Sequence, residues 1–342
     1  MAIDAAELIA VRLPLVRPFV TATTTTAARE VLLVRVVVEG VEGWGECSAE
    51  QEAAYWHETV HTARAVLPAI AAGRPAPHHP MAEAAFEMAV LDATLRAEHR
   101  SLAGYLGATR SHVDATATVG FDDDIDAFVA AGYRSVKVKV APEHPLPAGV
   151  HHAAAAAVGV QVDANGSYAS VPERVADLDG LGLVCIEQPL AAEDLAGHAR
   201  LCRELRTTVC LDESVASLAS LDAVLAARAA GAVSVKPARL GGIVAARRAH
   251  DRCVDAGIPA KVGGLLETGI GRAAALAVAA LPGFSLPADL SASDRYWVDD
   301  LTEPFVLDGA GRLAVPDGPG LGVTVRTEVI EQAALWRQDI TP

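Results

Sequence analysis

The sequence lacks the features of a protein that binds nucleic acid or a membrane. It has 28 lysines and arginines against 43 acidic residues, a formal net charge of −15, and no basic run offsets this deficit. A protein that binds duplex nucleic acid shows a basic face. The longest apolar stretches, such as Ala273–Leu281, fall far short of the roughly 20 residues that a membrane-spanning helix needs. Nucleic acid and membranes are therefore not expected partners.

Cysteine is scarce and shows no pairing pattern. The five cysteines form no C-x-x-C pair and no even-numbered framework, so we expect buried thiols in a reducing compartment. Asp4 and Glu7 stand where a signal peptide would have a basic segment and an apolar core. Apolar residues make up 51% of the chain and charged residues 21%, which excludes a disordered protein. We therefore expect a folded, cytoplasmic protein of one large domain or two.

The first hundred residues predict a small α+β unit. Glu30–Glu39 is rich in β-branched residues and predicts a strand. The periodicity becomes helical from about Ala53 to Leu106, and the proline-rich break Pro75–Pro80 separates two helices, the second over Met81–His99. The threonine-rich stretch Thr21–Thr26 is expected to be a loop.

From about Val113, short apolar runs alternate with alanine-rich helical segments. Continuous β-branched runs separated by helices are typical of a parallel sheet that is covered on both faces. The runs lie at Ser135–Val140, Gly159–Ala164, Val184–Gln188, Val209–Asp212, Ala232–Lys236, Pro259–Gly263 and Phe284–Pro287. Eight such units favour a closed barrel of the (β/α)₈ type over an open sheet.

The predicted fold class is therefore α/β, a modified TIM barrel of (β/α)₇β form with an α+β capping domain. The barrel is expected over residues 113–295 and the cap over residues 1–112. The strand-rich segment of about 296–342 should return to the cap and complete it.

Five polar residues interrupt the ends of successive runs at a nearly constant spacing. They are Lys139, Asp163, Glu187, Asp212 and Lys236, separated by 24, 24, 25 and 24 residues. One βα unit takes about this length, so each residue should lie at the same height on its strand. The carboxyl ends of barrel strands form the active-site mouth. The spacing thus predicts three converging acids flanked by two lysines, whereas ordinary buried charges have no reason to share one spacing.

This arrangement suits a hard divalent cation. Three carboxylates at close range repel one another unless a cation joins them. Ligation by oxygen alone favours Mg²⁺, with Mn²⁺ as the alternative. Lys137 and Lys139 are two residues apart on a strand and face the same way, and their mutual repulsion favours the neutral amine that a base must be. The chemistry fits removal of a proton α to a carboxylate, with the cation holding the product anion.

At these residues the sequence resembles the enolase superfamily, in its muconate-lactonizing subgroup. The matching stretches are Lys137–Lys139, Val162–Tyr168, Ile186–Pro189, Leu211–Ser214 and Val235–Gly242. Enzymes of this superfamily use a lysine or histidine base together with Mg²⁺.

The resemblance assigns a role to each of these residues. It implies that Lys139 is the base and that Lys236 is either the opposite-face acid/base or the cation that steadies the enolate. It implies supporting roles for Asn165 and Glu213, and a cap whose loops near Phe19–Thr26 and Glu50–Trp56 close over the substrate. The implied metal ligands are Asp163, Glu187 and Asp212.

Two further stretches resemble the branch of this subgroup that contains o-succinylbenzoate synthases and N-acylamino acid racemases. They are Gly263–Arg272, in which Gly264 and Glu267 become candidate substrate-binding or supporting residues, and Ser291–Trp297. Arg239, three residues after Lys236, is also similar to this branch and would tune that lysine. The strand-seven histidine of mandelate racemases and the strand-eight Asp-x-Asp of dipeptide epimerases are absent from the sequence.

The branch implies one of two reactions on a small carboxylate. The first is the syn dehydration of 2-succinyl-6-hydroxy-2,4-cyclohexadiene-1-carboxylate to o-succinylbenzoate in menaquinone biosynthesis. The alternative is racemisation of an N-acylamino acid, such as an N-succinylamino acid, by proton exchange between the two lysines. The same residues serve both reactions, so both stay open, and the unusual loops Phe19–Thr26 and Pro142–His152 leave the substrate side chain open. The resemblance also implies a homo-oligomer.

Two other motifs point to different classes of protein. His57-Glu-Thr-Val-His61 matches the zincin pattern H-E-x-x-H, but no further histidine ligand follows, so we expect exposed side chains on a helix face. Gly269–Ala274 resembles a dinucleotide-binding turn with Asp289 about twenty residues later, but it follows the seventh predicted barrel strand rather than a first strand. We interpret it either as a turn that binds a substrate carboxylate or as the turn that starts a helix, with N–H groups able to hold an anion. A barrel that only binds ligand is the third alternative.

Overall fold

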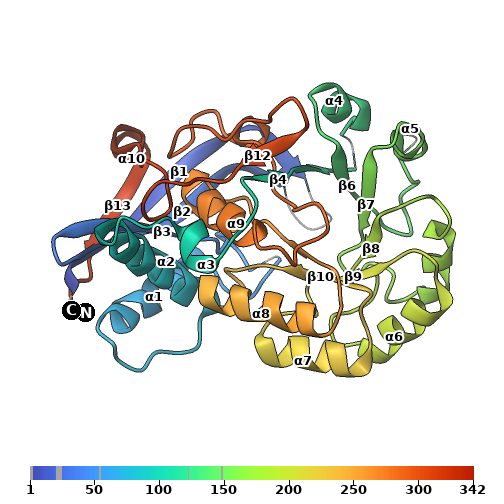
Figure 1. The fold of residues 1–342 in the computed structure, drawn as a ribbon, viewed down its shortest axis with the longest axis horizontal. Helices are drawn as coiled ribbons and strands as arrows, with labels where there is room; N and C mark the ends of the chain where they lie inside the picture. The colour runs from blue at the N-terminus through green and yellow to red at the C-terminus, as the bar shows by residue number, and fades with distance from the viewer. Residues whose placement is uncertain (1–2, 21–24, 54, 122, 148) are drawn as a thin grey trace.

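The computed structural model describes residues 3–20, 25–53, 55–121, 123–147 and 149–342. Most of the predicted loop Thr21–Thr26 lies outside these residues. The chain forms two units that lie side by side, an antiparallel sheet covered by helices and a barrel of parallel strands surrounded by helices (Figure 1).

The cap is built on a four-stranded antiparallel sheet in the order β13-β1-β2-β3. Alternate residues of the central strands, such as Leu8 and Val34, are fully buried and pack with the helices α1 and α2. Gly45 allows strand β3 to lie directly on α2, because a Cβ atom there would come within 2.0 Å of the Ala85 carbonyl oxygen. The strands are β1 (Ile3–Val20), β2 (Thr25–Val38), β3 (Val41–Cys47) and β13 (Ala334–Asp339).

The last strand of the chain pairs with the first. Glu7 in β1 lies opposite Asp339 in β13, and both chain ends lie at the same edge of the cap (Figure 1). The prediction that the C-terminal segment returns to the N-terminal unit is therefore confirmed.

The two predicted cap helices are present and are separated by the proline-rich segment. Thr59 caps α1 in a capping box with Thr62, and the His79 ring accepts a hydrogen bond from the Ala82 N–H at the start of α2. The helices of this part of the chain are α1 (Val60–Ala71), α2 (Pro80–Ala97) and α3 (Leu102–Leu106), and α10 (Thr327–Ala333) precedes β13.

The barrel strands form a parallel sheet in the order β11-β10-β9-β8-β7-β6-β5, which is the order of the chain reversed. The barrel strands are β5 (Thr116–Val119), β6 (Ser135–Lys139), β7 (Gly159–Asp163), β8 (Cys185–Glu187), β9 (Val209–Leu211), β10 (Ala232–Val235) and β11 (Ala260–Val262). Strands β6 to β11 coincide with predicted apolar runs to within two residues, whereas β5 was not among those runs.

Helices connect these strands and cover the outside of the barrel (Figure 1). They are α4 (Ile125–Ala130), α5 (Gly149–Ala155), a 3₁₀ helix (Pro172–Leu178), α6 (Leu195–Glu204), α7 (Leu218–Ala227), α8 (Ile243–Asp255), α9 (Gly269–Ala279) and a second 3₁₀ helix (Ser293–Arg295). A short antiparallel ribbon of β4 (His112–Asp114) and β12 (Arg312–Ala314) lies beside them.

The eighth position of the barrel is filled by an irregular segment instead of a regular strand. Isolated bridges join Ala288 to Ala115 and Asp289 to Gly263, so residues on both sides of the gap between β11 and β5 are connected. Pro287 has no N–H to donate to a ladder, which explains why no continuous strand forms there. The expectation of eight regular strands was therefore wrong in its last element, although the barrel closes.

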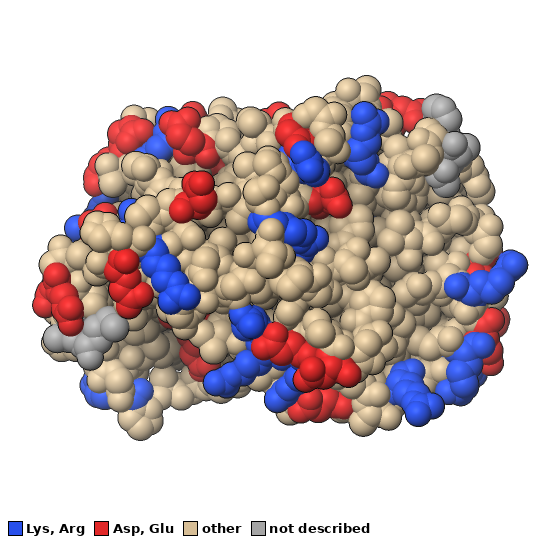
Figure 2. Space-filling view, in the orientation of Figure 1, with Lys and Arg blue, Asp and Glu red and all other residues tan. Residues whose placement is uncertain are grey.

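The surface and the thiols agree with the composition. On the face shown in Figure 2, acidic and basic side chains are interspersed among uncharged residues. All five cysteines are free, and four of them are buried. Among the described residues, no helix combines the length and hydropathy that crossing a bilayer demands.

Candidate active site

Three carboxylates meet at one end of the barrel, as the spacing predicted. Asp163 and Glu187 are the last residues of β7 and β8 and are register partners, and Asp212 directly follows β9. All three are at most 1% exposed. Buried carboxylates at the carboxyl ends of adjacent parallel strands must be neutralised by nearby cations.

Lysines on both sides of this row neutralise it. Lys139 ends β6, and its Nζ lies 2.7 Å from Asp163 Oδ2. Lys236 directly follows β10, and its Nζ lies 2.7 Å from Asp212 Oδ2. The structure therefore brings together all five residues of the periodic pattern, with the lysines flanking the acids. We call this set, together with Lys137, the acid–lysine cluster.

Lys137 occupies the centre of the acid–lysine cluster. Its Nζ lies 3.0 Å from Asp163 Oδ2, 2.5 Å from Asp289 Oδ2 and 3.7 Å from Glu187 Oε1. Burial opposes its charge, but the surrounding carboxylates, Asp163 first, raise the pKa of Lys137 well above its usual value. Lys137 is therefore a permanent cation.

Asp289 is a member of the site that sequence reasoning missed. The sequence analysis considered it only as part of a dinucleotide motif. In the structure it lies in the irregular eighth segment, accepts a hydrogen bond from Thr118 Oγ1 at 2.9 Å and pairs with Lys137. Asp289 could have been predicted from its position, because it follows the eighth predicted barrel strand.

The charges of the acids are stabilised by their neighbours. Burial by itself would raise the pKa of Asp163, but Lys137 and Lys139 lower it overall. The pKa of Asp212 is likewise lowered, because Arg239 and Lys236 outweigh burial. Both carboxylates are therefore ionised at neutral pH and available as oxygen ligands.

The supporting residues Asn165 and Glu213 extend the acid–lysine cluster on the Lys139 side. Lys139 Nζ lies 2.5 Å from Asn165 Oδ1, and Asn165 Nδ2 donates to Glu213 Oε1 at 2.8 Å. Burial first, and then Asp212 and Asp163, raise the pKa of Glu213 to about 7. The second oxygen of Glu213 is buried and accepts no hydrogen bond from the described residues.

The cap contributes a residue to the site that the sequence analysis did not single out. Tyr55 accepts hydrogen bonds through its hydroxyl from Lys236 at 2.7 Å and from Arg239 at 3.1 Å, and donates to Asp212 Oδ2 at 3.2 Å. Tyr55 belongs to the segment Glu50–Trp56 that was expected to close over the substrate, and its place fits that expectation. Arg239 is fully buried and also binds Asp212 Oδ1 at 2.5 Å.

Gly264 and Glu267 lie beyond the end of β11. A Cβ atom at Gly264 would come within 2.6 Å of the Asp289 carbonyl oxygen, so the backbone passes closely there. Glu267 Oε1 accepts from the Leu265 N–H at 2.9 Å, and its Oε2 is buried with no hydrogen bond from the described residues. The described contacts of Glu267 do not include Lys236.

The start of helix α9 does not offer a free anion site. Glu46, from cap strand β3, accepts hydrogen bonds from the Thr268 and Gly271 N–H groups, both at 2.9 Å, and Asp300 accepts from Gly269 N–H at 2.7 Å. Of the two interpretations of this turn, the start of a helix is therefore confirmed. Its N–H groups bind carboxylates of the protein itself and connect the cap to the barrel.

The zincin-like motif does not form a metal site. His57 precedes the first residue of α1 and is exposed, so the motif is not on one helix face as expected. Glu58 is buried instead, where its carboxylate lies 2.6 Å from His79 Nδ1 and accepts from the Met81 N–H. These contacts fix the start of α2.

The acid–lysine cluster has the donors that a hard cation requires. Glu187 Oε1 is a buried carboxylate oxygen that accepts no hydrogen bond from any residue that the structure describes. With Asp163 and Asp212 it provides oxygen ligands of the kind that Mg²⁺ prefers. In the described part of the chain, no three acidic, histidine or cysteine side chains already form a metal cage, and a lysine ammonium group binds one oxygen of each of the three carboxylates. A cation would therefore compete with the lysines.

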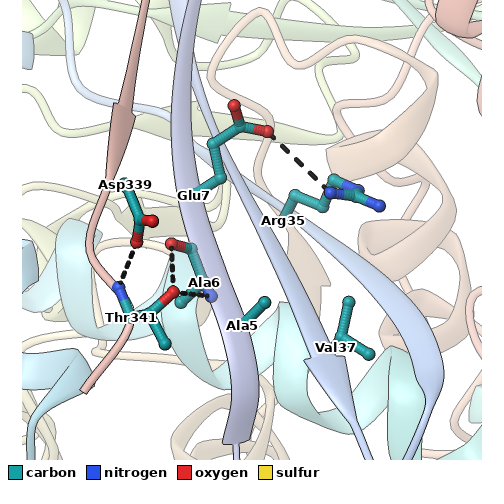
Figure 3. Close-up of a pocket in the computed structure, with 7 residues that line it drawn as sticks. All are labelled: Ala5, Ala6, Glu7, Arg35, Val37, Asp339 and Thr341. Carbon is teal, nitrogen blue, oxygen red and sulfur yellow. Dashed lines mark hydrogen bonds and ion pairs between the residues drawn. The ribbon is translucent and has the colours of Figure 1, made fainter.

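A pocket in the cap is not part of this site. It has a volume of about 190 Å³ and is formed by strands β13, β1 and β2, which carry no member of the acid–lysine cluster (Figure 3). Its polar groups already have partners within the protein: Ala6 N–H donates to Thr341 Oγ1, and Arg35 pairs with Glu42 at 2.5 Å.

Comparisons with known proteins agree with the geometry. Residues 5–107 match the mandelate racemase / muconate lactonizing enzyme N-terminal domain, and residues 121–329 match the enolase C-terminal domain-like family. An N-succinylamino acid racemase of Amycolatopsis sp is 43% identical over 98% of this chain and 99% of its own length. An o-succinylbenzoate synthase of Geobacillus stearothermophilus is 36% identical over 92% and 91%. The crystal structure of an enolase superfamily member from Listeria innocua superposes with a TM-score of 0.91 at 31% identity, covering 100% of this chain and 99% of that one.

Proposed function

This chain belongs to the mandelate racemase / muconate lactonizing enzyme family of the enolase superfamily, and from this premise we propose that it removes the proton α to a carboxylate from a succinyl-bearing substrate. The observation that carries the proposal is the acid–lysine cluster, in which Lys139 and Lys236 flank the buried acids and pair with different members of the row. The names of the two relatives, N-succinylamino acid racemase and o-succinylbenzoate synthase, share a succinyl group.

The reaction we assign is the syn dehydration that yields o-succinylbenzoate. Lys139, as the free amine, takes the α proton, and the electrons of the broken C–H bond form the new double bond as the hydroxyl leaves. Lys139 then returns its proton to the departing hydroxyl on the same face, which gives water. The ammonium group of Lys236 stabilises negative charge as it builds on the substrate carboxylate.

Asp163, Glu187 and Asp212 would hold a divalent cation, Mg²⁺ or in its place Mn²⁺. When bound, the cation supplies positive charge against the substrate carboxylate and so makes the α carbon more acidic. The buried Glu187 oxygen without a hydrogen bond supports this assignment.

Racemisation of an N-succinylamino acid is the second candidate, and one observation favours it. Lys236 is held by Asp212 and by the Tyr55 hydroxyl, on the other side of the acids from Lys139. Two bases on opposite sides suit a 1,1-proton transfer, in which Lys139 removes the α proton and the Lys236 ammonium delivers one to the opposite face.

The test is a kinetic comparison of both substrates with Mg²⁺ in D₂O. Dehydration produces o-succinylbenzoate, whereas racemisation returns the amino acid with deuterium at the α carbon. Turnover of the cyclohexadiene substrate supports the dehydratase, turnover of the amino acid supports the racemase, and turnover of neither overturns the proposal.

The finer expectations about the protein's context remain part of this proposal. The free cysteines suit a cytoplasmic enzyme. We retain the division into a cap of residues 1–112 with about 296–342 and a barrel of residues 113–295. Val16 and Val298 are large apolar side chains that are more than half exposed, on segments joined by the Leu15–Trp297 bridge, which supports a homo-oligomer.

A further inference from the structure

The distribution of lysine singles out one residue that the proposed function does not use. The chain contains 28 basic residues, but only four of them are lysines, and the other 24 are arginines. The four are Lys137, Lys139, Lys236 and Lys261, and all four are on barrel strands or directly follow one. Three belong to the acid–lysine cluster. The fourth, Lys261, has no assigned role.

Lys261 is fully buried beneath the acid–lysine cluster. It lies in β11 opposite Ser234 of β10, two residues before the position level with Lys236. Its Nζ lies 2.6 Å from Glu187 Oε2 and 2.5 Å from Gln161 Oε1. The contact with the Glu187 carboxylate has the geometry of an ion pair, so Lys261 carries its charge there as an ammonium ion.

The floor of the barrel fixes the position of this ammonium ion. Gln161, which accepts from Lys261, donates through Nε2 to Ser135 Oγ at 3.2 Å and to Thr116 Oγ1 at 3.4 Å. Thr116 and Ser135 are themselves joined by a 3.0 Å hydrogen bond. Lys261 is therefore held by strands β5, β6 and β7 against an acid of β8. Such a network leaves it no route to the substrate side of the site.

The two oxygens of Glu187 have different environments. Oε2 is bound by Lys261, whereas Oε1 accepts no hydrogen bond from the described residues and lies 3.7 Å from Lys137 Nζ. Lys261 thus neutralises the carboxylate at Oε2, and Oε1 is left to bind a cation. A positive charge fixed next to a ligand carboxylate opposes the binding of a second positive charge there.

We propose that Lys261 is a positioning residue that acts through Glu187: it neutralises this acid from beneath and thereby weakens the hold of the site on its divalent cation. This inference rests on the proposed function, because it presumes that Glu187 is a cation ligand. Lys261 keeps the buried acid paired when the cation is absent, since an unpaired buried charge is strongly destabilising. The same pairing makes the cation exchangeable.

The test is the affinity of the substrate-free protein for Mn²⁺, measured by electron paramagnetic resonance or calorimetry. Lys261→Met removes the charge and keeps the length of the side chain. We expect it to bind Mn²⁺ at least tenfold more tightly than the wild type. The matched control is Ser234→Ala. Ser234 is a buried, uncharged residue at the same level of the barrel, and its hydroxyl makes no hydrogen bond to Lys261 or Glu187. The affinity of Ser234→Ala should stay within twofold of the wild type.

A double-mutant cycle tests whether the effect passes through Glu187. In a Glu187→Gln background the acid is already neutral, so Lys261→Met should tighten binding by less than threefold. Equal tightening in both backgrounds, or affinity in Lys261→Met that is unchanged or weaker, would overturn the proposal. If Lys261→Met folds only with cation, the rise in Tm on adding Mn²⁺ replaces the affinity. A larger rise than in the wild type supports the proposal, and an equal or smaller one overturns it.

The outcome also separates this inference from the function on which it rests. Wild-type protein that binds no Mn²⁺ at millimolar concentration would overturn the proposed function and this inference with it. Wild-type binding without any effect of Lys261→Met would overturn only the role of Lys261.

Discussion

The cap pocket and the acid–lysine cluster contain the same kinds of side chains but differ in burial. In the pocket, Arg35 is 36% exposed and pairs with Glu7, as Figure 3 shows, and also with Glu42 of the same sheet. In the cluster, Lys137 is 4% exposed and its carboxylate partners come from three different barrel segments. The ion pairs of the pocket join residues within one sheet. The ion pairs of the acid–lysine cluster join residues from different barrel segments, which meet only because the barrel closes.

This difference shows where charge has a use beyond stability. Exposed ion pairs contribute about 0–1 kcal/mol and are common on surfaces. Buried pairs cost desolvation energy that their mutual attraction often does not recover. A set of buried acids and lysines at the open end of a barrel therefore does not stabilise the fold efficiently. We interpret it as a set that serves catalysis.

The largest expected effect is in the acid–lysine cluster. Lys139→Ala removes the proposed base, and the rate of product formation should fall by about 10³-fold or more, in line with the contribution of general base catalysis. Arg35→Ala in the cap pocket should leave kcat unchanged. Steady-state kinetics on the substrate that the wild type turns over measures both. A comparable loss of kcat in Lys139→Ala and Arg35→Ala would contradict the functional difference between the acid–lysine cluster and the cap pocket.

A second prediction concerns Glu46, the buried acid through which the cap binds the start of α9. Burial raises the pKa of Glu46 from 4.5 to about 7 in the folded protein, so folding favours its protonated form. Below pH 4.5 the group is protonated in both states, and above pH 7 folding must bury a charge. Wild-type stability should therefore fall relative to Glu46→Gln as pH rises from about 4.5 to 7, by up to roughly 3 kcal/mol.

Denaturant unfolding of both proteins between pH 4 and 8 measures this difference. A difference in the free energy of unfolding that stays constant with pH would show that Glu46 does not titrate with folding. Glu46 is a buried acid that lies outside the acid–lysine cluster. The measurement therefore shows what burial alone does to an acid that has no lysine partner in the cluster.

A smaller effect is expected for Tyr55→Phe, which keeps the ring and removes the hydroxyl. Lys236 and Arg239 each lose a hydrogen-bond acceptor, which costs about 1–3 kcal/mol for a buried group. We expect kcat/KM to fall about tenfold, and more for racemisation than for dehydration, because only racemisation needs Lys236 to transfer a proton. An equal loss in both reactions would argue against a distinct role for Lys236.

The smallest effect is expected for the stability of the cap pocket. Arg35→Ala removes an ion pair that is about one-third exposed, so the free energy of unfolding should change by no more than about 1 kcal/mol. Chemical denaturation at neutral pH is sufficient to measure it. If the free energy of unfolding fell by several kcal/mol, the exposed ion pairs of the pocket would contribute as much to stability as buried ion pairs do.

Much of the barrel and its site could be predicted from periodicity. The apolar runs gave the strands, and the spacing of Lys139, Asp163, Glu187, Asp212 and Lys236 brought five side chains to one end because each βα unit has nearly the same length. The same spacing continues to Lys261, 25 residues after Lys236. A lysine inside an apolar strand was a usable signal that the sequence analysis passed over.

Other members of the site could not be predicted in this way. Tyr55 reaches Lys236 from the cap, across 181 residues of sequence, and no local pattern encodes that contact. Asp289 lies in an irregular segment where Pro287 prevents a regular strand, so the period is lost there. The sequence around the start of α9 gave no sign that its N–H groups have a partner in the protein. In the structure Glu46, 222 residues away in the sequence, accepts their hydrogen bonds.

The most direct test of the central claim is the fate of the substrate α proton in D₂O, followed by proton NMR with and without Mg²⁺. The account predicts that metal-free enzyme leaves the α-proton signals of both candidate substrates intact and that Mg²⁺ restores their loss. Loss of the signal at the same rate without any divalent cation, or persistence of both signals with Mg²⁺, would contradict it.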